Sequence, residues 1–331
     1  MIELKERFRG CIMGGAIGDA FGFPVEFLSL DSIKKKYGED GIRHLKVREN
    51  AAYFSDDTQM TLFTAEGLIK AHDREVTLKK SIYLSYLDWL KTQYEISPLS
   101  SEGLLSVPTL FDRRAPGTTC LSALNSGLEG GISYPINNSK GCGGVMRTAP
   151  VALFCFAKGA NVLGANELAA EAAAITHGHV LGHLPSYALN HILYEILSGA
   201  ELCDAVNRSI EATEERYSEI DSAALGISKM RIATMLAEHP TASDDAAISM
   251  LGEGWVAEEA LAISIYCALK HKDNFLDAII AAVNHDGDSD STGAITGNIL
   301  GAYLGYEAIP TELSDTIEAK DVILEISDAL L

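Results

Sequence analysis

Three aspartates stand at alternate positions in the segment "NHDGDSDSTGAITGN", residues 284 to 298, directly before a run of glycines and other small residues. They are Asp286, Asp288 and Asp290. Carboxylates held this close repel one another unless a cation neutralises them. Oxygen donors without a thiolate suit a hard ion such as Mg²⁺ or Mn²⁺. The spacing therefore raises the hypothesis of a metal site at this point in the chain.

The side chains of Asp288 and Asp290 converge only if the backbone between them is not regular helix. In a regular helix each residue turns by about 100°, so these two side chains would point about 200° apart. Asp and Ser are good N-cap residues, and apolar residues at helical spacing resume in "TGAITGNILGAYLG". We therefore predict a helix that begins at about residue 290, with the acidic residues at its cap.

A second cluster, "YFSDDTQMTLFTAEGLI", has the same pattern of a hydroxyl residue and two acids before a long amphipathic segment. Its polar residues are Ser55, Asp56, Asp57 and Thr58. A carboxylate at a helix start is expected from capping and from the helix dipole, so a capped turn with spare surface acids is one interpretation. Capping needs only one side chain, however. Two such clusters facing each other would hold two ions, and a two-metal site can orient hydroxyls and activate water.

Helices must position these clusters, because apolar residues recur at helical spacing along most of the chain and convincing alternating strands are absent. Clear examples are residues 58–72, 78–94, 165–176, 188–199 and 256–270. Short breaks with turn chemistry separate them, at 37–41, 112–119, 133–144, 177–183 and 285–289. No linker marks a second unit, so we predict a single all-α domain over residues 1–331.

Composition narrows the classes of function. A formal net charge of −20 repels phosphates, and the lysines and arginines form no basic stripe, which argues against nucleic acid as a partner. The 6 cysteines show no metal-ligand spacing and indicate reduced thiols. The start "MIELKERFRGCIMGG" lacks the apolar core of a signal peptide, and no apolar run reaches the length of a membrane span. We therefore expect a cytoplasmic protein without membrane contact.

The ordered set of motifs in this chain resembles the ADP-ribosylglycohydrolase family. The motifs are "GCIMGGAIGDAFGFPVEF", "SDDTQMTLFTAEGL", "KGCGGVMRTAPVAL", "ITHGH", "GWVAEEALAISIY" and "DGDSDSTGAITGNILGAYLG". The resemblance extends from about residue 5 to about residue 306. It implies a single compact multi-helix domain with a binuclear metal cleft that holds two Mg²⁺ ions, or Mn²⁺. The reaction that it implies is hydrolysis of the bond between ADP-ribose and an acceptor.

The resemblance also implies the metal ligands. A hydroxyl residue followed by two acids, and Asp-x-Asp followed by Ser or Thr, are the two ligand motifs of the family. They match Ser55, Asp56, Asp57, Asp288, Asp290 and Ser291. Asp286 stands where the family usually has glycine, so it is left out of the ligand set.

Two carboxylates are the candidates for acid and base, Glu26 in "GDAFGFPVEF" and Asp57. In the family, the glutamate that corresponds to Glu26 lies on a mobile loop over the metals and is implicated in catalysis. We expect Asp19, in the same motif, either to have a structural role or to contact the metal ligands without binding a metal itself. We expect Gly14, Gly15, Gly18 and Gly22 to allow close packing of helices.

The segment "SKGCGGVMRTAP" is the expected cradle for the diphosphate, because successive glycines leave backbone N–H groups free to face an anion and a helix start follows. Relatives often have asparagine where this chain has Cys142. Arg147 either contacts substrate or forms a buried ion pair. His177 matches a family histidine near the ADP-ribose. The substrate-binding candidates are Gly117, Ser139, Lys140, Gly141, Cys142, Gly143, Gly144, Arg147 and His177.

The expected substrate is an ADP-ribosylated protein side chain, with arginine favoured as acceptor, or a small ADP-ribosyl compound. We expect a monomer. Two alternatives stay open. One is a catalytically silent, ADP-ribose-binding or structural protein, and the other is a hydrolase of a free ADP-ribosyl compound or a modified nucleic acid.

Overall fold

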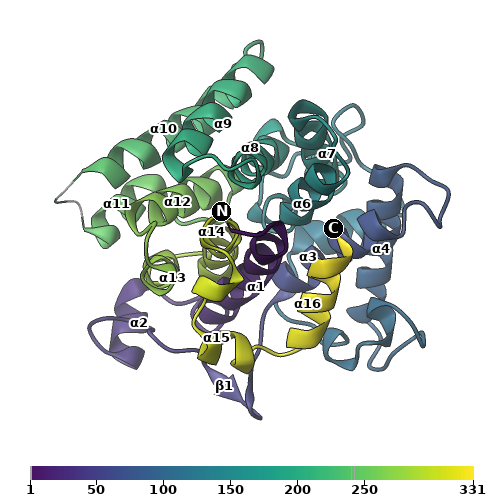
Figure 1. Cartoon of the computed structure of the whole chain (residues 1–331), viewed down its shortest axis with the longest axis horizontal. Coiled ribbons are helices and arrows are strands. Elements are labelled where there is room, and N and C mark those ends of the chain that lie inside the picture. Colours follow the sequence, from purple (N-terminus) through teal and green to yellow (C-terminus); the bar gives the residue numbers. More distant parts are fainter. Residues whose placement is uncertain (1, 240, 242) are drawn as a thin grey trace.

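Helices make up nearly all of the regular structure in the computed structural model, which describes residues 2–239, 241 and 243–331 (Figure 1). The α-helices are α1 Leu4–Gly22, α2 Leu30–Tyr37, α3 Asp56–Ile69, α4 Leu78–Thr92, α5 Thr118–Asn125, α6 Ala149–Ala157, α7 Val162–Ala174, α8 Val180–Leu197, α9 Leu202–Arg216, α10 Ala223–Glu238, α11 Asp244–Leu251, α12 Ala257–Lys270, α13 Phe275–Val283, α14 Ser289–Leu304, α15 Thr311–Thr316 and α16 Lys320–Ala329. Short 3₁₀ turns are η1 Leu104–Ser106, η2 Pro108–Leu110, η3 Cys142–Gly144 and η4 Tyr306–Ala308. The prediction of an all-α fold is confirmed.

Two details differ from the sequence prediction. The predicted break at 177–183 is shorter than expected, because α8 begins at Val180 and accommodates Pro185 inside the helix. A two-stranded hairpin, β1 Val47–Arg48 and β2 Ala51–Ala52, was not predicted. Strands of two residues are too short to show alternation. The turn between them places Glu49 and Asn50 at positive φ, a conformation that suits a tight hairpin.

Glycines on one face of α1 and on one face of α14 bring the two helices into backbone contact at the centre of the molecule (Figure 1). Gly10, Gly14 and Gly18 lie four residues apart and therefore share a face. Each lies against a glycine of α14, and a Cβ built on Gly18 would be only 2.0 Å from the carbonyl oxygen of Gly293. The prediction of close helix packing is confirmed for Gly14, Gly15, Gly18 and Gly22, since each lies against a residue of α14. Gly10 was not among the predicted glycines.

This packing is antiparallel and positions both ends of the candidate site. Gly10 faces Gly301, whereas Gly22, the last residue of α1, faces Ser289, the first residue of α14. The chain that leaves α1 toward Glu26 therefore lies beside the start of α14, where Asp288 and Asp290 stand. The first helix and a helix from the last part of the chain thus bring the acidic residues together.

The start of α3 is fixed to the same end of α1 by Asp19. Its carboxylate accepts hydrogen bonds from the backbone N–H of Ser55 at 2.8 Å, the N–H of Thr58 at 2.9 Å and the Thr58 hydroxyl at 2.5 Å. Asp19 is fully buried. It has the structural role that the sequence predicted.

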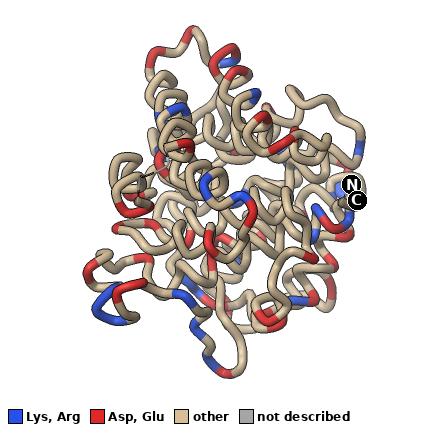
Figure 2. Tube along the Cα trace, turned by 60° about the vertical axis from the view of Figure 1, so that its left-hand side comes forward, with Lys and Arg blue, Asp and Glu red and all other residues tan. Residues whose placement is uncertain are grey.

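Acidic and basic residues are both spread over many elements of the chain, with one group of basic residues in the loops at the lower left and the bottom of the view (Figure 2). The acidity is therefore a property of the whole surface, and the site must be identified from its buried carboxylates. Among the described residues, no helix is both long enough and apolar enough to cross a membrane.

Candidate metal-binding and substrate site

Carboxylates from two distant parts of the chain meet in one buried group. Oxygens of Glu26, Asp288 and Asp290 lie within 4.8 Å of one another, and all three residues are buried. Asp56 and Asp57, at the start of α3, line the same pocket and are also buried. The structure therefore brings the two predicted acidic clusters together and adds Glu26 to them.

Helix capping explains how the acidic side chains converge. Ser55 is the N-cap of α3, and its hydroxyl accepts a hydrogen bond from the N–H of Asp57 at 3.2 Å. Asp288 is the N-cap of α14, with non-helical backbone angles of φ −80° and ψ 76°. It stands outside the helix, whereas Asp290 lies in the first turn. This irregular start allows the two side chains to face the same point, as the sequence required.

Crowding disfavours the charged form of these carboxyls. Burial, followed by the charge of Asp290, raises the pKa of Glu26 to about 11. Burial and the neighbouring acids likewise raise the pKa values of Asp56, Asp57 and Asp290 well above the usual range. Burial raises the pKa of Asp288 as well, against several hydrogen bonds that lower it. Such a group gains stability from any cation that enters it.

The donor set fits a hard divalent cation. Glu26 Oε2 and Asp57 Oδ2 are buried and have no hydrogen-bond partner among the described residues. An unpartnered buried carboxylate oxygen is costly, and a metal ion satisfies it. The available atoms are carboxylate and hydroxyl oxygens, which Mg²⁺ and Mn²⁺ prefer.

Asp286 lies outside this group. Its side chain is exposed and accepts a hydrogen bond at 2.8 Å from the backbone N–H of Leu30, at the start of α2. It holds α2 in place and does not contribute an oxygen to the buried cluster, which agrees with its exclusion from the ligand set.

A cavity of about 370 Å³ opens beside the acidic residues. Five of the substrate-binding candidates line it, namely Gly117, Gly141, Cys142, Gly143 and His177. The metal-ligand candidates Asp56, Asp57, Asp288, Asp290 and Ser291 line it too, together with Glu26. Ser55 does not line the cavity, since it is fully buried at the cap of α3.

Four substrate-binding candidates do not line the cavity. The Lys140 side chain forms an ion pair with Glu258, and the Ser139 hydroxyl lies 3.1 Å from that of Thr119. Gly144 faces α8, where a Cβ would be 2.4 Å from the carbonyl oxygen of Gly182. The fourth, Arg147, is fully buried. The side chains of these residues contact other parts of the protein and not the cavity. Their position next to glycines in the sequence therefore did not predict that they line it.

The glycine loop is less free than its sequence suggested. The backbone N–H of Cys142 donates to the carbonyl of Trp255 at 3.2 Å, and the N–H of Gly141 donates to the Ser139 hydroxyl at 3.4 Å. The turn η3 follows, and α6 begins only at Ala149. These two N–H groups are therefore engaged within the protein, whereas the sequence predicted that backbone N–H groups of this loop are free to face an anion.

Cys142 contacts the acidic cluster directly. Its thiol donates to Asp288 Oδ2 at 2.6 Å, and burial, followed by the charge of Asp288, raises the pKa of the thiol well above its usual value. It therefore stays protonated and acts as a hydrogen-bond donor to a predicted metal ligand.

Sequence reasoning missed an aromatic pair at the cavity. Phe27 and Trp255 stack with ring centroids 5.8 Å apart and planes 16° apart, and both line the cavity. The Phe27 side chain is 72% exposed, which is unusual for a large apolar residue. The sequence feature that could have revealed Phe27 is its position directly after Glu26. Also missed were Ala115, Pro116, Thr118, Thr119, Cys120 and Met146.

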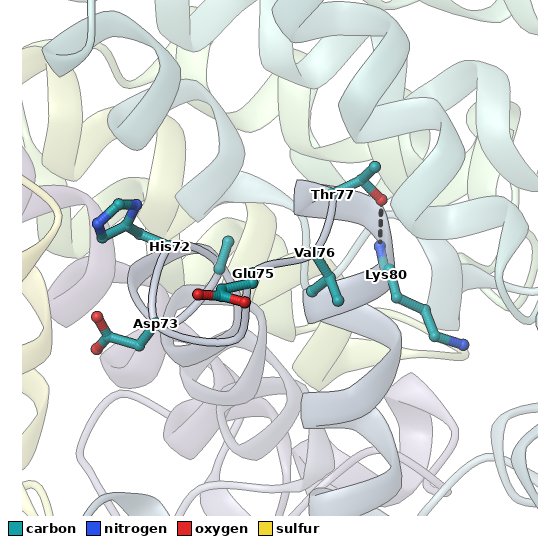
Figure 3. A pocket seen from close by; sticks show the side chains of 7 residues that line it. His72, Asp73, Glu75, Val76, Thr77 and Lys80 are labelled. Atoms are coloured by element: carbon teal, nitrogen blue, oxygen red, sulfur yellow. Dashed lines mark hydrogen bonds between the residues drawn. The ribbon is translucent and has the colours of Figure 1, made fainter.

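Another surface hollow, of about 920 Å³, is shown in Figure 3. The residues that line it are Ala71, His72, Asp73, Glu75, Val76, Thr77 and Lys80. The side chains of His72, Asp73 and Lys80 point in different directions there, and the hydrogen bond drawn is the capping bond from the Lys80 N–H to the Thr77 hydroxyl. Because no set of polar groups converges, this hollow is a poor candidate for a site despite its volume.

The Gly143→Ala substitution is expected to weaken binding of ADP-ribose, the ligand that the family resemblance implies, about tenfold, since overpacking costs roughly 1–3 kcal/mol. A Cβ there would lie 3.0 Å from the sulfur of Cys120 and 3.1 Å from Cε1 of His177, and both residues line the cavity. Gly141→Ala is the matched control, because its Cβ meets nothing closer than 3.4 Å. Calorimetric titration of both variants with ADP-ribose measures the effect. Equal affinities would contradict the prediction, because they would mean that Cys120 and His177 can move to accommodate the added Cβ.

The chain matches the ADP-ribosylglycohydrolase family over residues 1–331. It is 27% identical to an ADP-ribosylarginine hydrolase Tri1 of Serratia proteamaculans, over 99% of this chain and 80% of that protein. It is 25% identical to the mouse ADP-ribosylhydrolase ARH3, over 94% of this chain and 87% of that protein. A solved structure titled "ADP-ribosylglycohydrolase-related protein complex" shares the fold, with a TM-score of 0.65 and 24% identity, over 99% of this chain and 98% of that chain. The chain therefore belongs to the ADP-ribosylglycohydrolase family of hydrolases.

Proposed function

We propose that this protein is a metal-dependent hydrolase that cleaves the glycosidic bond between ADP-ribose and an arginine side chain. The observation that carries the proposal is the buried group of Glu26, Asp288 and Asp290 beside a cavity walled by the glycine loop. A purely structural protein has no need for crowded carboxylates whose charged forms are disfavoured.

The residues that would hold two divalent cations, Mg²⁺ or Mn²⁺, are Ser55, Asp56, Asp57, Asp288, Asp290 and Ser291. When bound, the cations supply positive charge that polarises the ribose hydroxyls and a water molecule. The starts of α3 and α14 hold these residues in place before any ligand arrives. The backbone N–H of Ser55 donates to the Asp19 carboxylate, and that of Asp288 donates to the Glu253 carbonyl.

Glu26 and Asp57 are the candidates to move protons. Each keeps one carboxylate oxygen without a hydrogen-bond partner among the described residues, and each lines the cavity. General acid–base catalysis requires such a free oxygen within reach of the reacting group. Carboxylates nearby also stabilise the oxocarbenium-like transition state of glycoside hydrolysis.

Arginine as the acceptor is supported by the aromatic pair and by the charge around it. A guanidinium binds the faces of Phe and Trp through cation–π contact and stacking, and an exposed pair of rings stands at this cavity. The acidic residues of the site favour a cationic leaving group. The name of the Serratia relative, ADP-ribosylarginine hydrolase, points to the same acceptor.

The proposal is tested by measuring release of ADP-ribose from arginine-linked, serine-linked and free nucleotide-sugar substrates, with Mg²⁺ and with chelator. We expect release from the arginine-linked substrate that chelator abolishes. Release from the serine-linked substrate alone would reassign the acceptor. Binding of ADP-ribose without release from any substrate would favour the silent, ADP-ribose-binding alternative.

A further inference from the structure

Arg147 is a fully buried arginine that no carboxylate neutralises within the described part of the chain. One terminal nitrogen lies 3.4 Å from the sulfurs of Met60 and Cys120. The other donates to the Ala172 carbonyl at 3.3 Å and to the Thr176 hydroxyl at 2.6 Å. The guanidinium also lies over the Tyr86 ring, 4.3 Å from its centroid. The buried ion pair considered from the sequence is therefore not formed.

In the hydrogen bond between Arg147 and Thr176, the donor and the acceptor can be assigned. A guanidinium only donates hydrogen bonds, so the Thr176 oxygen is the acceptor in that contact. The same oxygen lies 2.8 Å from Nδ1 of His177. A hydroxyl carries one hydrogen, and besides Arg147 the partners found for this oxygen among the described residues are Nδ1, at 2.8 Å, and the Cys120 thiol. Donation of this hydrogen to Nδ1, the ring nitrogen at 2.8 Å, places the ring proton of a neutral His177 on Nε2.

Nε2 of His177 faces the glycine loop. A Cβ built on Gly141 would lie 3.4 Å from Nε2, and one built on Gly143 would lie 3.3 Å from it. His177 lines the cavity, and no acceptor for Nε2 is found among the described residues. An N–H donor is thus presented to the cavity wall where the sequence placed the diphosphate.

We infer that Arg147 is a positioning residue which, through Thr176, fixes His177 as a neutral Nε2–H donor to an anionic diphosphate oxygen of the substrate. This inference rests on the proposed function for the identity of the ligand. The chain of contacts explains why the buried cation has a hydroxyl as its nearest polar partner. Burial and the charge of Arg147 also hold the pKa of His177 down to about 3, which keeps the ring neutral at physiological pH.

The test is nitrogen-detected NMR of the histidine rings in the folded protein, with and without ADP-ribose. We expect His177 to show protonated Nε2 and bare, hydrogen-bonded Nδ1, and we expect ADP-ribose to shift the Nε2–H resonance downfield. A proton on Nδ1 in the wild-type protein would overturn the inference, because Thr176 would then accept from both neighbours.

Substitutions at Thr176 test the relay without removing a buried charge. Thr176→Val keeps the shape of the side chain but removes the hydroxyl, and we expect about tenfold weaker binding of ADP-ribose and a displaced Nδ1 resonance. Thr176→Ser should restore both, which a purely steric role would not require. Equal affinities in the two variants, both folded by circular dichroism, would overturn the inference. Failure of wild-type protein to bind ADP-ribose would instead refute the proposed function and leave the Nδ1 assignment standing.

Discussion

Replacement of Asp290 by asparagine is expected to reduce turnover by on the order of 100-fold or more and, at the same time, to stabilise the metal-free protein. Asp290 lies within 4.8 Å of Glu26 and Asp288 and is the neighbour whose charge most raises the pKa values of Glu26, Asp56 and Asp57. Its loss removes a predicted metal ligand and also relieves the crowding.

The sign of the stability change follows from linkage. A carboxyl whose pKa is higher in the folded protein than in the unfolded chain binds more protons when folded, so stability falls as pH rises from about 4. The raised pKa values of Asp290 and its neighbours therefore cost the metal-free wild type stability at pH 7 to 8. The asparagine that replaces Asp290 cannot ionise, so the variant escapes part of this cost.

Thermal unfolding in chelator and in Mg²⁺, at pH 5 and at pH 8, measures the change in stability and the loss of metal binding, and release of ADP-ribose measures turnover. In chelator at pH 8 the Asp290→Asn variant should melt above the wild type, and the difference should shrink at pH 5. In Mg²⁺ the order should reverse, because only the wild type binds the ions well. Asp286→Asn is the matched control, since Asp286 is exposed and outside the cluster. A variant at Asp290 with wild-type turnover would refute the metal assignment.

Gly18→Ala is expected to destabilise the fold by about 3 kcal/mol or more. The added Cβ would lie 2.0 Å from the carbonyl oxygen of Gly293, and backbone cannot yield as a flexible side chain can. Helices α1 and α14 must separate, and the start of α14 must then move away from Glu26. We therefore expect the variant to lose Mg²⁺-dependent stabilisation together with stability.

Urea unfolding measures the free energy of unfolding of each variant. Because this free energy falls linearly with urea concentration, the values extrapolated to water can be compared. Gly164→Ala is the control, because Gly164 is also helical but its Cβ would meet only the Asn161 side chain, at 3.4 Å. That substitution should be neutral or slightly stabilising, since alanine is the better helix former. A Gly18→Ala protein as stable as the control would contradict the backbone contact.

Several parts of the structure were predictable because local chemistry determines them. Ser55 and Asp288 cap α3 and α14, as a hydroxyl or acid before an amphipathic run predicts. The glycines at every fourth position of α1 predicted a close helix contact, although the sequence did not identify α14 as the partner. Capping and periodicity act over a few residues, so one sequence is enough to reveal them.

The walls of the cavity were less predictable, because long-range packing decides which side of a loop faces the ligand. Lys140 and Arg147 flank the glycines in sequence, yet the first pairs with Glu258 and the second is buried against Thr176. Trp255 comes from a part of the chain more than 100 residues away and reaches the loop through a backbone bond to Cys142. No local pattern encodes such a contact.

The contact between α1 and α14 also bears on how the protein is made. About 270 residues separate the end of α1 from the start of α14. At about 5–20 residues per second, the ribosome needs roughly tens of seconds to synthesise that interval. During this time the nascent chain carries a glycine-rich apolar helix whose partner does not yet exist. Full assembly of the core around α1 must therefore wait until synthesis is nearly complete.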